Sequence, residues 1–180
     1  RLAKQEGFRV NCNTTIFDGV RVEEAEAFFD SLKPLGLDGI TVSSGYHYNG
    51  ALDQEHFMAR QRTHAFFGKL LSKNRNGRWN FNHSILYLEF LQGKRNYDCT
   101  PWGNPSYSVL GWQQPCYLLD EGYVPTFTEL MEKTAWNKYG HKRNPKCADC
   151  TAHCGYEPTA VEDSTSSLKN MFLSLKTVFQ

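Results

Sequence analysis

The 180-residue chain lacks several features that would assign it to a class at once. No run of apolar residues is long enough to cross a bilayer, so the sequence predicts no membrane-spanning helix. No secretory signal precedes the first strand-like segment, which argues against an oxidising compartment. The net charge is only +1, which argues against a general nucleic-acid surface. We therefore expect a cytoplasmic protein with no nucleic-acid partner.

The chain also lacks an initiating methionine, since it begins with Arg1 and its first residues already approach a strand. This start indicates the C-terminal piece of a longer protein. Hydrophobic residues make up 40% of the chain and charged residues 22%, so a packed core can form.

The first half of the chain alternates strand and helix signals. Runs of β-branched and aromatic residues predict strands at residues 7–17, 39–43 and 84–90. Apolar residues at helical spacing predict helices at residues 22–32 and 53–71, the second with Asp53 as its cap. Alternation at these lengths is typical of βαβ units with a parallel sheet, so the expected fold class is α/β.

The composition changes after about Gly93, where proline, glycine, tryptophan and cysteine replace the regular pattern. A capping box at Thr126 and Glu129 predicts one more helix, and an amphipathic stripe predicts another over residues 167–179. We therefore divide the chain into an α/β part, residues 1–93, and a cysteine-rich α+β and loop region, residues 94–180.

Five of the six cysteines lie in two sequence clusters of this second region: Cys99 and Cys116, then Cys147, Cys150 and Cys154. Soft thiolates grouped this closely typically hold a metal ion or an iron–sulfur cluster. A cysteine that only packs in a core needs no such spacing. The clusters therefore predict a metal centre. The sixth cysteine, Cys12, lies in a predicted strand, and we expect its side chain to pack in the core.

Four thiolates would complete one site, from Cys99, Cys116, Cys147 and Cys150. Cys154 is a fifth candidate, and His153 is a weaker one. A tight turn at residues 102–105 would make a hairpin that brings the first two thiols together. Zinc, an iron–sulfur cluster, structural disulfides and free thiols all remain open at this point.

The spacing Cys99-x(11)-Gly111-x(4)-Cys116, followed by Cys147-x2-Cys150, resembles the auxiliary-cluster motif of radical S-adenosylmethionine (SAM) enzymes, in its twitch or SPASM form. Cys154 departs from that motif, because SPASM domains place their next cysteine further away. Several short sequence segments resemble those of the radical SAM enzymes of hopanoid biosynthesis, the adenosylhopane synthase family. These segments are residues 14–20, 38–43, 53–57, 99–105, 111–119, 121–123 and 147–157.

The resemblance implies a partial (β/α) barrel, of which residues 1–93 would be the C-terminal half, and the cofactors SAM and a [4Fe–4S] cluster. The cluster cleaves SAM, and the 5′-deoxyadenosyl radical adds to the alkene of a hopene. A polycyclic triterpene substrate and a reducing electron donor are thus the implied partners. Enzymes of this family bind SAM through the fourth and fifth strands of the barrel. Polar residues at the strand ends of this chain are therefore the expected contacts with SAM: Asn11, Asn13, Thr15, Ser43 and Ser44.

One departure from the family pattern is decisive for activity. The Cys-x3-Cys-x2-Cys loop that holds the SAM cluster is absent from these 180 residues, so we expect this chain alone not to cleave SAM. The alternative function is a non-catalytic zinc-binding interaction module on a half-barrel.

Further candidates are weaker. Strand-end residues 46–48 could line the substrate cavity, and a large apolar pocket could be walled by Trp102, Trp112, Tyr117 and Tyr123. The basic loop from Lys138 to Lys146 could contact anionic lipid headgroups at the inner membrane surface. The alternatives are that the aromatic residues cover a small core and that the basic loop is a solvated surface.

Overall fold

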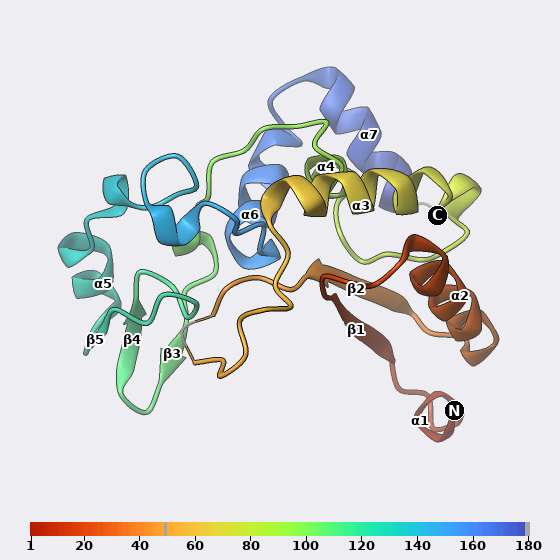
Figure 1. Ribbon diagram of the computed structural model, residues 1–180, viewed down its shortest axis with the longest axis horizontal. Coiled ribbons are helices and arrows are strands. Elements are labelled where there is room, and N and C mark those ends of the chain that lie inside the picture. Colours follow the sequence, from red (N-terminus) through yellow and green to blue (C-terminus); the bar gives the residue numbers. More distant parts are fainter. Residues whose placement is uncertain (49, 179–180) are drawn as a thin grey trace.

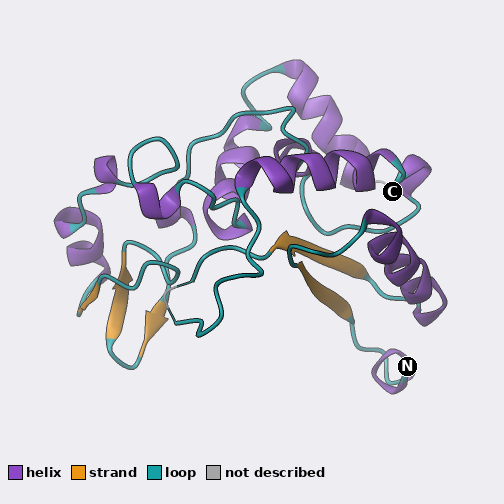
Figure 2. Cartoon of the chain, viewed as in Figure 1, coloured by secondary structure: helices purple, strands orange, loops and turns teal. Residues whose placement is uncertain are grey.

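The computed structural model describes residues 1–48 and 50–178 (Figure 1). The described part contains seven α-helices and five strands, joined by long loops and short 3-10 turns (Figure 2). The strands form two separate sheets, one parallel and one antiparallel, that lie toward opposite ends of the molecule. This arrangement confirms a mixed α/β fold. Residue 179, the end of the predicted C-terminal helix, lies outside the described residues.

A short helix α1 (Leu2–Gln5) precedes the parallel sheet, which consists of β1 (Asn11–Ile16) and β2 (Gly39–Ser44). The helix α2 (Val22–Leu32) connects the two strands, with the bounds that the sequence predicts. Its N-terminus is closed by Arg21 and Glu24, because the backbone N–H of Arg21 donates to Glu24 Oε2 over 3.0 Å. The first βαβ unit is therefore confirmed.

The segment after residue 78 pairs with β2 through a single parallel bridge, between Ile40 and Phe81. The Ile40 N–H donates to the Asn80 carbonyl over 2.8 Å. The next N–H of β2 on this side, that of Val42, donates to Nε2 of buried His83 over 3.0 Å. The ring of His83 thus replaces a backbone carbonyl at the point where the chain leaves the sheet.

The strand predicted at residues 84–90 is wrong, because the helix α4 (Ile85–Leu91) occupies this segment. Ser84 caps the helix, and its Oγ accepts the N–H of Tyr87 over 3.2 Å. Most of α4 is buried, since it packs against three other helices, α3, α6 and α7. A helix buried on most sides loses its polar face, so its sequence cannot be told from a buried strand by periodicity alone.

The helix α3 (Arg60–Ser72) begins at Arg60 and not at the predicted cap, Asp53. Asp53 instead closes a turn, in which its Oδ1 accepts the N–H of Glu55 over 2.8 Å and its Oδ2 contacts His56 over 2.9 Å. The residue that precedes α3 is Ala59, whose side chain makes no cap. The N-terminus of α3 therefore takes no cap from its own segment.

The sheet, α2, α3 and α4 share one apolar core, in which Ile16, Ile40 and Val42 of the strands meet the rings of the helices. Phe29 of α2 is fully buried and packs edge-on against Phe81, with ring centroids 5.3 Å apart. This core continues into the C-terminal region through buried Tyr97, Tyr156 and Ala160. The two predicted regions are thus packed together, and their division at residue 93 remains a prediction.

The antiparallel sheet consists of β3 (Tyr107–Ser108), β4 (Gly111–Gln114) and β5 (Gly122–Val124). The hairpin turns at residues 109–110 and not at the predicted 102–105, part of which forms a 3-10 turn at Pro101–Gly103. The helix α5 (Phe127–Lys133) follows, and Thr126 Oγ1 accepts the N–H of Glu129 as the capping box predicts.

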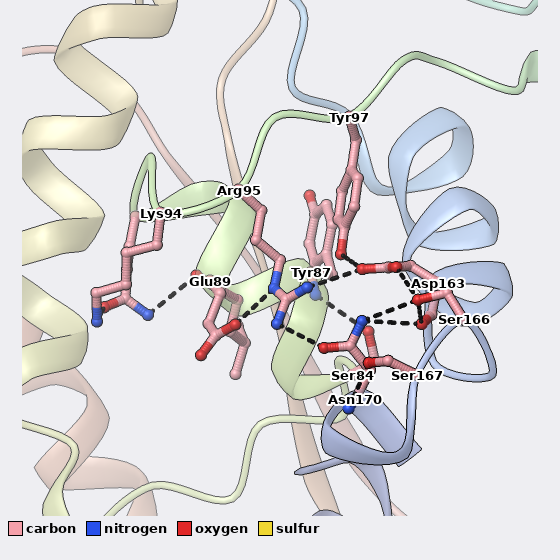
Figure 3. Close-up of polar contacts among 12 residues, drawn as sticks. Ser84, Tyr87, Glu89, Lys94, Arg95, Tyr97, Asp163, Ser166, Ser167 and Asn170 are labelled. Atoms are coloured by element: carbon pink, nitrogen blue, oxygen red, sulfur yellow. Dashed lines mark hydrogen bonds and ion pairs between the residues drawn. The ribbon is translucent and has the colours of Figure 1, made fainter. Parts of the chain in front are cut away.

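The last two helices, α6 (His153–Asp163) and α7 (Leu168–Val178), pack on α4. A polar clamp around Arg95 joins all three (Figure 3). Its guanidinium donates to Glu89 over 2.6 Å, to Asp163 over 2.8 Å and to Asn170 over 3.0 Å. The helix predicted after residue 167 is thus confirmed within the described residues, and its contacts are with the core.

Two parallel strands and one bridge do not close a barrel within residues 1–48 and 50–178. The half-barrel therefore stays a prediction. Of the helices described, none has the length and apolar character needed to span a membrane.

Candidate metal centre

Four of the predicted metal-ligating cysteines line one cavity: Cys99, Cys116, Cys147 and Cys150. They reach it from four places in the second half of the chain. Cys99 precedes the 3-10 turn at Pro101–Gly103, Cys116 follows β4, Cys147 ends the 3-10 turn at Pro145–Cys147, and Cys150 precedes α6. The space between the lining side chains amounts to about 430 Å³, part of it open to solvent. The fold therefore gathers thiols that are up to 51 residues apart in the chain.

All six cysteines are free thiols in the structure, so it contains no disulfide at this site. The other residues that line the cavity are mainly apolar or aromatic. Besides the thiols, the lining residues with ionisable groups are His47, Tyr139, Lys146 and Tyr156. Among the residues that the structure describes, no aspartate or glutamate lines the cavity. A soft, thiol-rich and carboxylate-free donor set suits iron–sulfur clusters or zinc and does not suit magnesium or calcium.

Backbone N–H groups hydrogen-bond to three of the four sulfur atoms. Those of Leu118 and Leu119 reach Cys116, that of Gly140 reaches Cys147, and that of Ala152 reaches Cys150. The tight turns of a cysteine knuckle direct N–H groups in this way, and a donor aimed at sulfur favours the thiolate over the thiol. Cys154, outside the cavity lining, also receives backbone N–H groups, those of Cys154 and Gly155, so such donors favour the thiolate but do not by themselves distinguish the cavity cysteines.

Cys99 is held by packing instead. A side chain at position 155 would overlap the Cys99 sulfur, because a Cβ built on Gly155 lies well inside van der Waals contact with it. The chain also crosses itself closely here, since the Thr100 N–H donates to the Gly155 carbonyl over 2.8 Å. Gly155 lies in the first turn of α6, and its lack of a side chain leaves room for the Cys99 sulfur beside the cavity.

Burial raises the pKa of every one of these thiols, and the neighbouring cysteines raise several of them further. The pKa of Cys150 rises to about 12, from burial first and from nearby thiols second, although the Ala152 N–H opposes the shift. The pKa of Cys99 rises further still for the same two causes, burial and the cysteine neighbours. A site with such thiols favours the thiolate form only when a cation is bound, so metal binding would release protons.

Cys154, the fifth candidate, lies outside the residues that line the cavity. It is buried in a small cluster with Leu118 and Ala152, and it is hydrogen-bonded to the hydroxyl of Tyr117. That hydroxyl lies 2.7 Å from the hydroxyl of Tyr46, in the segment that follows β2. His153, the weaker candidate, is also not among the lining residues, and its ring lies 6.0 Å from that of His83.

Within residues 1–48 and 50–178, no group of three or more histidine, cysteine, aspartate or glutamate side chains converges closely enough to hold a single metal ion. A tetrathiolate zinc site needs four sulfurs at about 2.3 Å from one point. The four thiols thus line one cavity without converging on a single point.

The five predicted SAM-contact residues divide between two surfaces of the parallel sheet. Asn11, Asn13 and Thr15 alternate along β1 and are exposed. Ser43 is paired with Thr15, and their hydroxyls are 3.4 Å apart, so it shares that surface. Ser44 belongs to the other surface, where its Oγ lies 2.7 Å from Thr151 Oγ1 in the loop before α6. Ser44 thus links the sheet to the cysteine loop, and the SAM contacts remain a prediction.

The aromatic residues predicted to wall one pocket are dispersed. Trp102 packs against Trp136, whereas Trp112 packs between Tyr107 and Phe127 at the antiparallel sheet. Neither tryptophan lines the thiol cavity. Of the strand-end residues, His47 lines the cavity, whereas Tyr46 contacts Tyr117 outside the lining.

The sequence analysis missed Arg60 and Gly155, which hold the cysteines in place. Arg60 lies 90 residues before Cys150, and no local pattern links them. Gly155 follows Cys154 directly, and its proximity in sequence to the cysteine run was the one signal available. Gly140 lies inside the basic loop and adopts a positive φ of 119°, which glycine tolerates.

Fold and site together define a class: a mixed α/β protein with a four-thiol cavity built from its C-terminal loops. The chain belongs to the family described as a domain of unknown function (DUF3463), whose model matches residues 40–174. The match begins within β2 and ends within α7, so it includes all four cavity cysteines. No curated protein and no solved structure matches the chain.

Proposed function

We propose that this chain is the C-terminal part of a radical SAM enzyme of hopanoid biosynthesis, and that Cys99, Cys116, Cys147 and Cys150 hold an auxiliary iron–sulfur cluster. One observation carries the metal-binding half of the proposal: four free thiols surround one cavity, and backbone N–H groups are directed at three of them. The sequence segments that resemble the adenosylhopane synthase family support the proposed enzymatic activity.

In this proposal a [4Fe–4S] cluster that lies outside these 180 residues supplies the reductive cleavage of SAM. The contribution of this chain is to bind, orient and exclude water. The hydroxyl and amide groups of Asn13, Thr15 and Ser43 share one surface of the sheet at its carboxyl end, where ligands of parallel α/β sheets bind. Their uncharged polarity suits the ribose and amino-acid groups of SAM.

The substrate in this proposal is a hopene-like triterpene, and the reaction joins its terminal alkene to the adenosyl carbon. In this proposal the protein works in the cytoplasm at the inner surface of the membrane, where its thiols would stay reduced and an apolar lipid substrate would be available. The exposed basic residues Lys138, Lys142 and Arg143 are available there for anionic headgroups.

Anaerobic reconstitution with iron and sulfide tests the cluster. We expect broad absorption near ~400 nm and an electron paramagnetic resonance signal on reduction, as for a thiolate-bound cluster. Serine variants of Cys99, Cys116, Cys147 and Cys150 should each lose most of the bound iron. Cys154→Ser and Cys12→Ser are the matched controls, because these thiols lie outside the cavity lining, and both should retain it. Iron loss that is equal in all six variants would contradict the assignment.

The second candidate, a zinc-binding interaction module, is favoured by the same four thiols, because cysteine knuckles on loops are the usual ligands of structural zinc. Colourless protein that retains stoichiometric zinc after anaerobic iron loading would support it. For the reaction, a polypeptide extended to include a SAM-cluster loop should consume SAM and form an adenosyl adduct of a hopene by mass spectrometry. Free 5′-deoxyadenosine without an adduct would refute the proposed substrate.

A further inference from the structure

The two residues between Cys147 and Cys150 contact the first residue of α3. Asp149 Oδ1 accepts the backbone N–H of Arg60 over 2.9 Å, and the Ala148 carbonyl accepts Arg60 Nε over 3.3 Å. A helix N-terminus carries unpaired N–H groups and a partial positive charge, so it favours a carboxylate oxygen at this position. Because Ala59 offers no cap and the first turn of α3 has no acidic residue, Asp149 supplies from the cysteine loop what the helix lacks.

The guanidinium of Arg60 completes the connection. Its Nη2 donates to the Cys150 carbonyl over 2.9 Å and to the Tyr156 hydroxyl over 2.6 Å. The group also lies over the rings of Tyr156 and Phe90, with 5.1 Å and 5.3 Å to their centroids. Those two rings are stacked 4.5 Å apart, so the guanidinium is held against a rigid pair. A planar fork can satisfy several acceptors at once, which an ammonium group cannot do in the same geometry.

We propose that Arg60 and Asp149 form a latch that positions the Cys147–Cys150 knuckle from the N-terminus of α3. Arg60 is a positioning residue, since it contacts the carbonyl of Cys150 and not its sulfur. The inference rests on the proposed function only in treating this knuckle as a ligand loop, and the latch itself is independent of which metal binds.

The latch also has a consequence in the opposite direction. The segment from residue 45 to residue 59 joins the carboxyl end of β2 to Arg60, and it carries His47, which lines the thiol cavity. Since contacts are reciprocal, metal that orders the knuckle must also stabilise the first turn of α3 and the end of this segment. Metal binding would thus slow the opening of the chain that joins the carboxyl end of β2 to Arg60.

Pulsed alkylation of the reduced, metal-free chain with N-ethylmaleimide tests the latch, with each cysteine quantified by mass spectrometry. In Arg60→Gln, the alkylation rates of Cys147 and Cys150 should rise about tenfold or more, as the loss of charge-assisted hydrogen bonds allows. The rate at Cys99 should change little. Arg62→Gln is the matched control on the same helix, because Arg62 contacts exposed Asp18 and not the cysteine loop, and it should leave all rates unchanged.

A second pair of variants keeps the test valid if Arg60→Gln folds poorly. Asp149→Ala removes the cap, and Asp149→Asn retains an oxygen acceptor for the Arg60 N–H. We expect faster alkylation of the knuckle and faster hydrogen exchange at the Arg60 amide in the first variant, and substantial rescue in the second. An equal rise at every cysteine, or no rise at Cys147 and Cys150, would overturn the latch.

Cadmium loading of the full chain separates this inference from the proposed function. Cadmium binds thiolates without iron–sulfur chemistry, and it should slow hydrogen exchange in the first turn of α3 in the wild-type chain but not in Arg60→Gln. Protection that is equal in both chains would refute the coupling even if an iron–sulfur cluster forms. Protection that differs, in a chain that forms no cluster, would leave the latch intact and refute the proposed function.

Discussion

The two halves of the molecule are stabilised by different interactions. The α/β half buries large rings and aliphatic side chains in one continuous core, in which Phe29, Phe67 and Leu70 are fully buried. Within the described residues, the cysteine-rich half contributes Tyr97, Tyr156 and Ala160 to that core and adds a small cluster of its own, built on Leu118, Ala152 and Cys154. Its loops are otherwise joined to the rest of the molecule by helix caps and by the Arg60 and Arg95 contacts. Loops with a small core need another source of order, and in the proposed function a metal bound by the four thiols would supply it.

The largest expected effect is on metal removal, and it should separate the two halves. Metal bound by four thiolates contributes on the order of 10 kcal/mol to the folding of a small site. Chelation should therefore abolish hydrogen-exchange protection in residues 111–124 while protection of β2 and α4 persists. Mass spectrometry of exchanged peptides measures both. Loss that is equal in the two halves would show that they form one cooperative unit.

The next effect concerns the apolar core. Phe29→Ala should lower the free energy of unfolding by about 3–5 kcal/mol, because it leaves a cavity beside Trp79 and Phe81. Leu2→Ala is the control, since Leu2 is 77% exposed, and it should change stability by less than about 0.5 kcal/mol. Denaturant titration followed by circular dichroism checks both. A small loss in Phe29→Ala would contradict the placement of this ring in the core.

Glycine 155 offers a smaller and more local test. Gly155→Ala should cost about 2 kcal/mol through overpacking against the Cys99 sulfur, and it should lower the bound iron or zinc by displacing that thiol. Gly68→Ala is the matched control inside α3, where the nearest atom lies 4.0 Å from the new Cβ. This control should be neutral or stabilising by about 0.5–1 kcal/mol. If both variants bind metal equally, Gly155 has no part in placing Cys99.

The smallest effect is a pH dependence at the junction of the two halves. Glu157 of α6 accepts from His83 Nδ1 over 2.7 Å and from the Ser84 N–H over 2.9 Å. Burial by itself raises the pKa of Glu157, but the hydrogen bonds from His83 and from the Ser84 N–H outweigh burial, so the net pKa is lowered. A carboxyl whose pKa is lower in the folded state stabilises the fold above its unfolded-state pKa, and this contribution is lost as the pH falls through the folded value.

We therefore expect the chain to lose stability from this group on acidification below about pH 4.5, the ordinary range of a glutamate. Glu157→Gln should remove that part of the pH dependence and leave the rest. Unfolding midpoints measured from pH 7 to pH 3 in both chains give the difference. Parallel curves for the two chains would contradict a lowered pKa at Glu157.

Much of the fold could be predicted from local patterns. The bounds of α2 follow from its amphipathic spacing and acidic first turn, and the start of α5 follows from the Thr126 capping box. The error at residues 84–90 has a physical cause, because α4 is buried on most sides and shows no polar face. The late start of α3 has a different physical cause, because the cap of that helix comes from Asp149, 89 residues away in the chain.

The site divides in the same way. Local chemistry identifies the thiols that are able to bind a soft metal and the segments that turn, because cysteine, glycine and proline act through their own side chains and backbone. The packing of separate elements brings Cys99 and Cys116 to the same cavity as the knuckle, leaves Cys154 beside Tyr117 and brings Arg60 to the Cys150 carbonyl. Such contacts depend on how separate elements pack, and packing is a property of the whole chain that no short stretch of sequence contains.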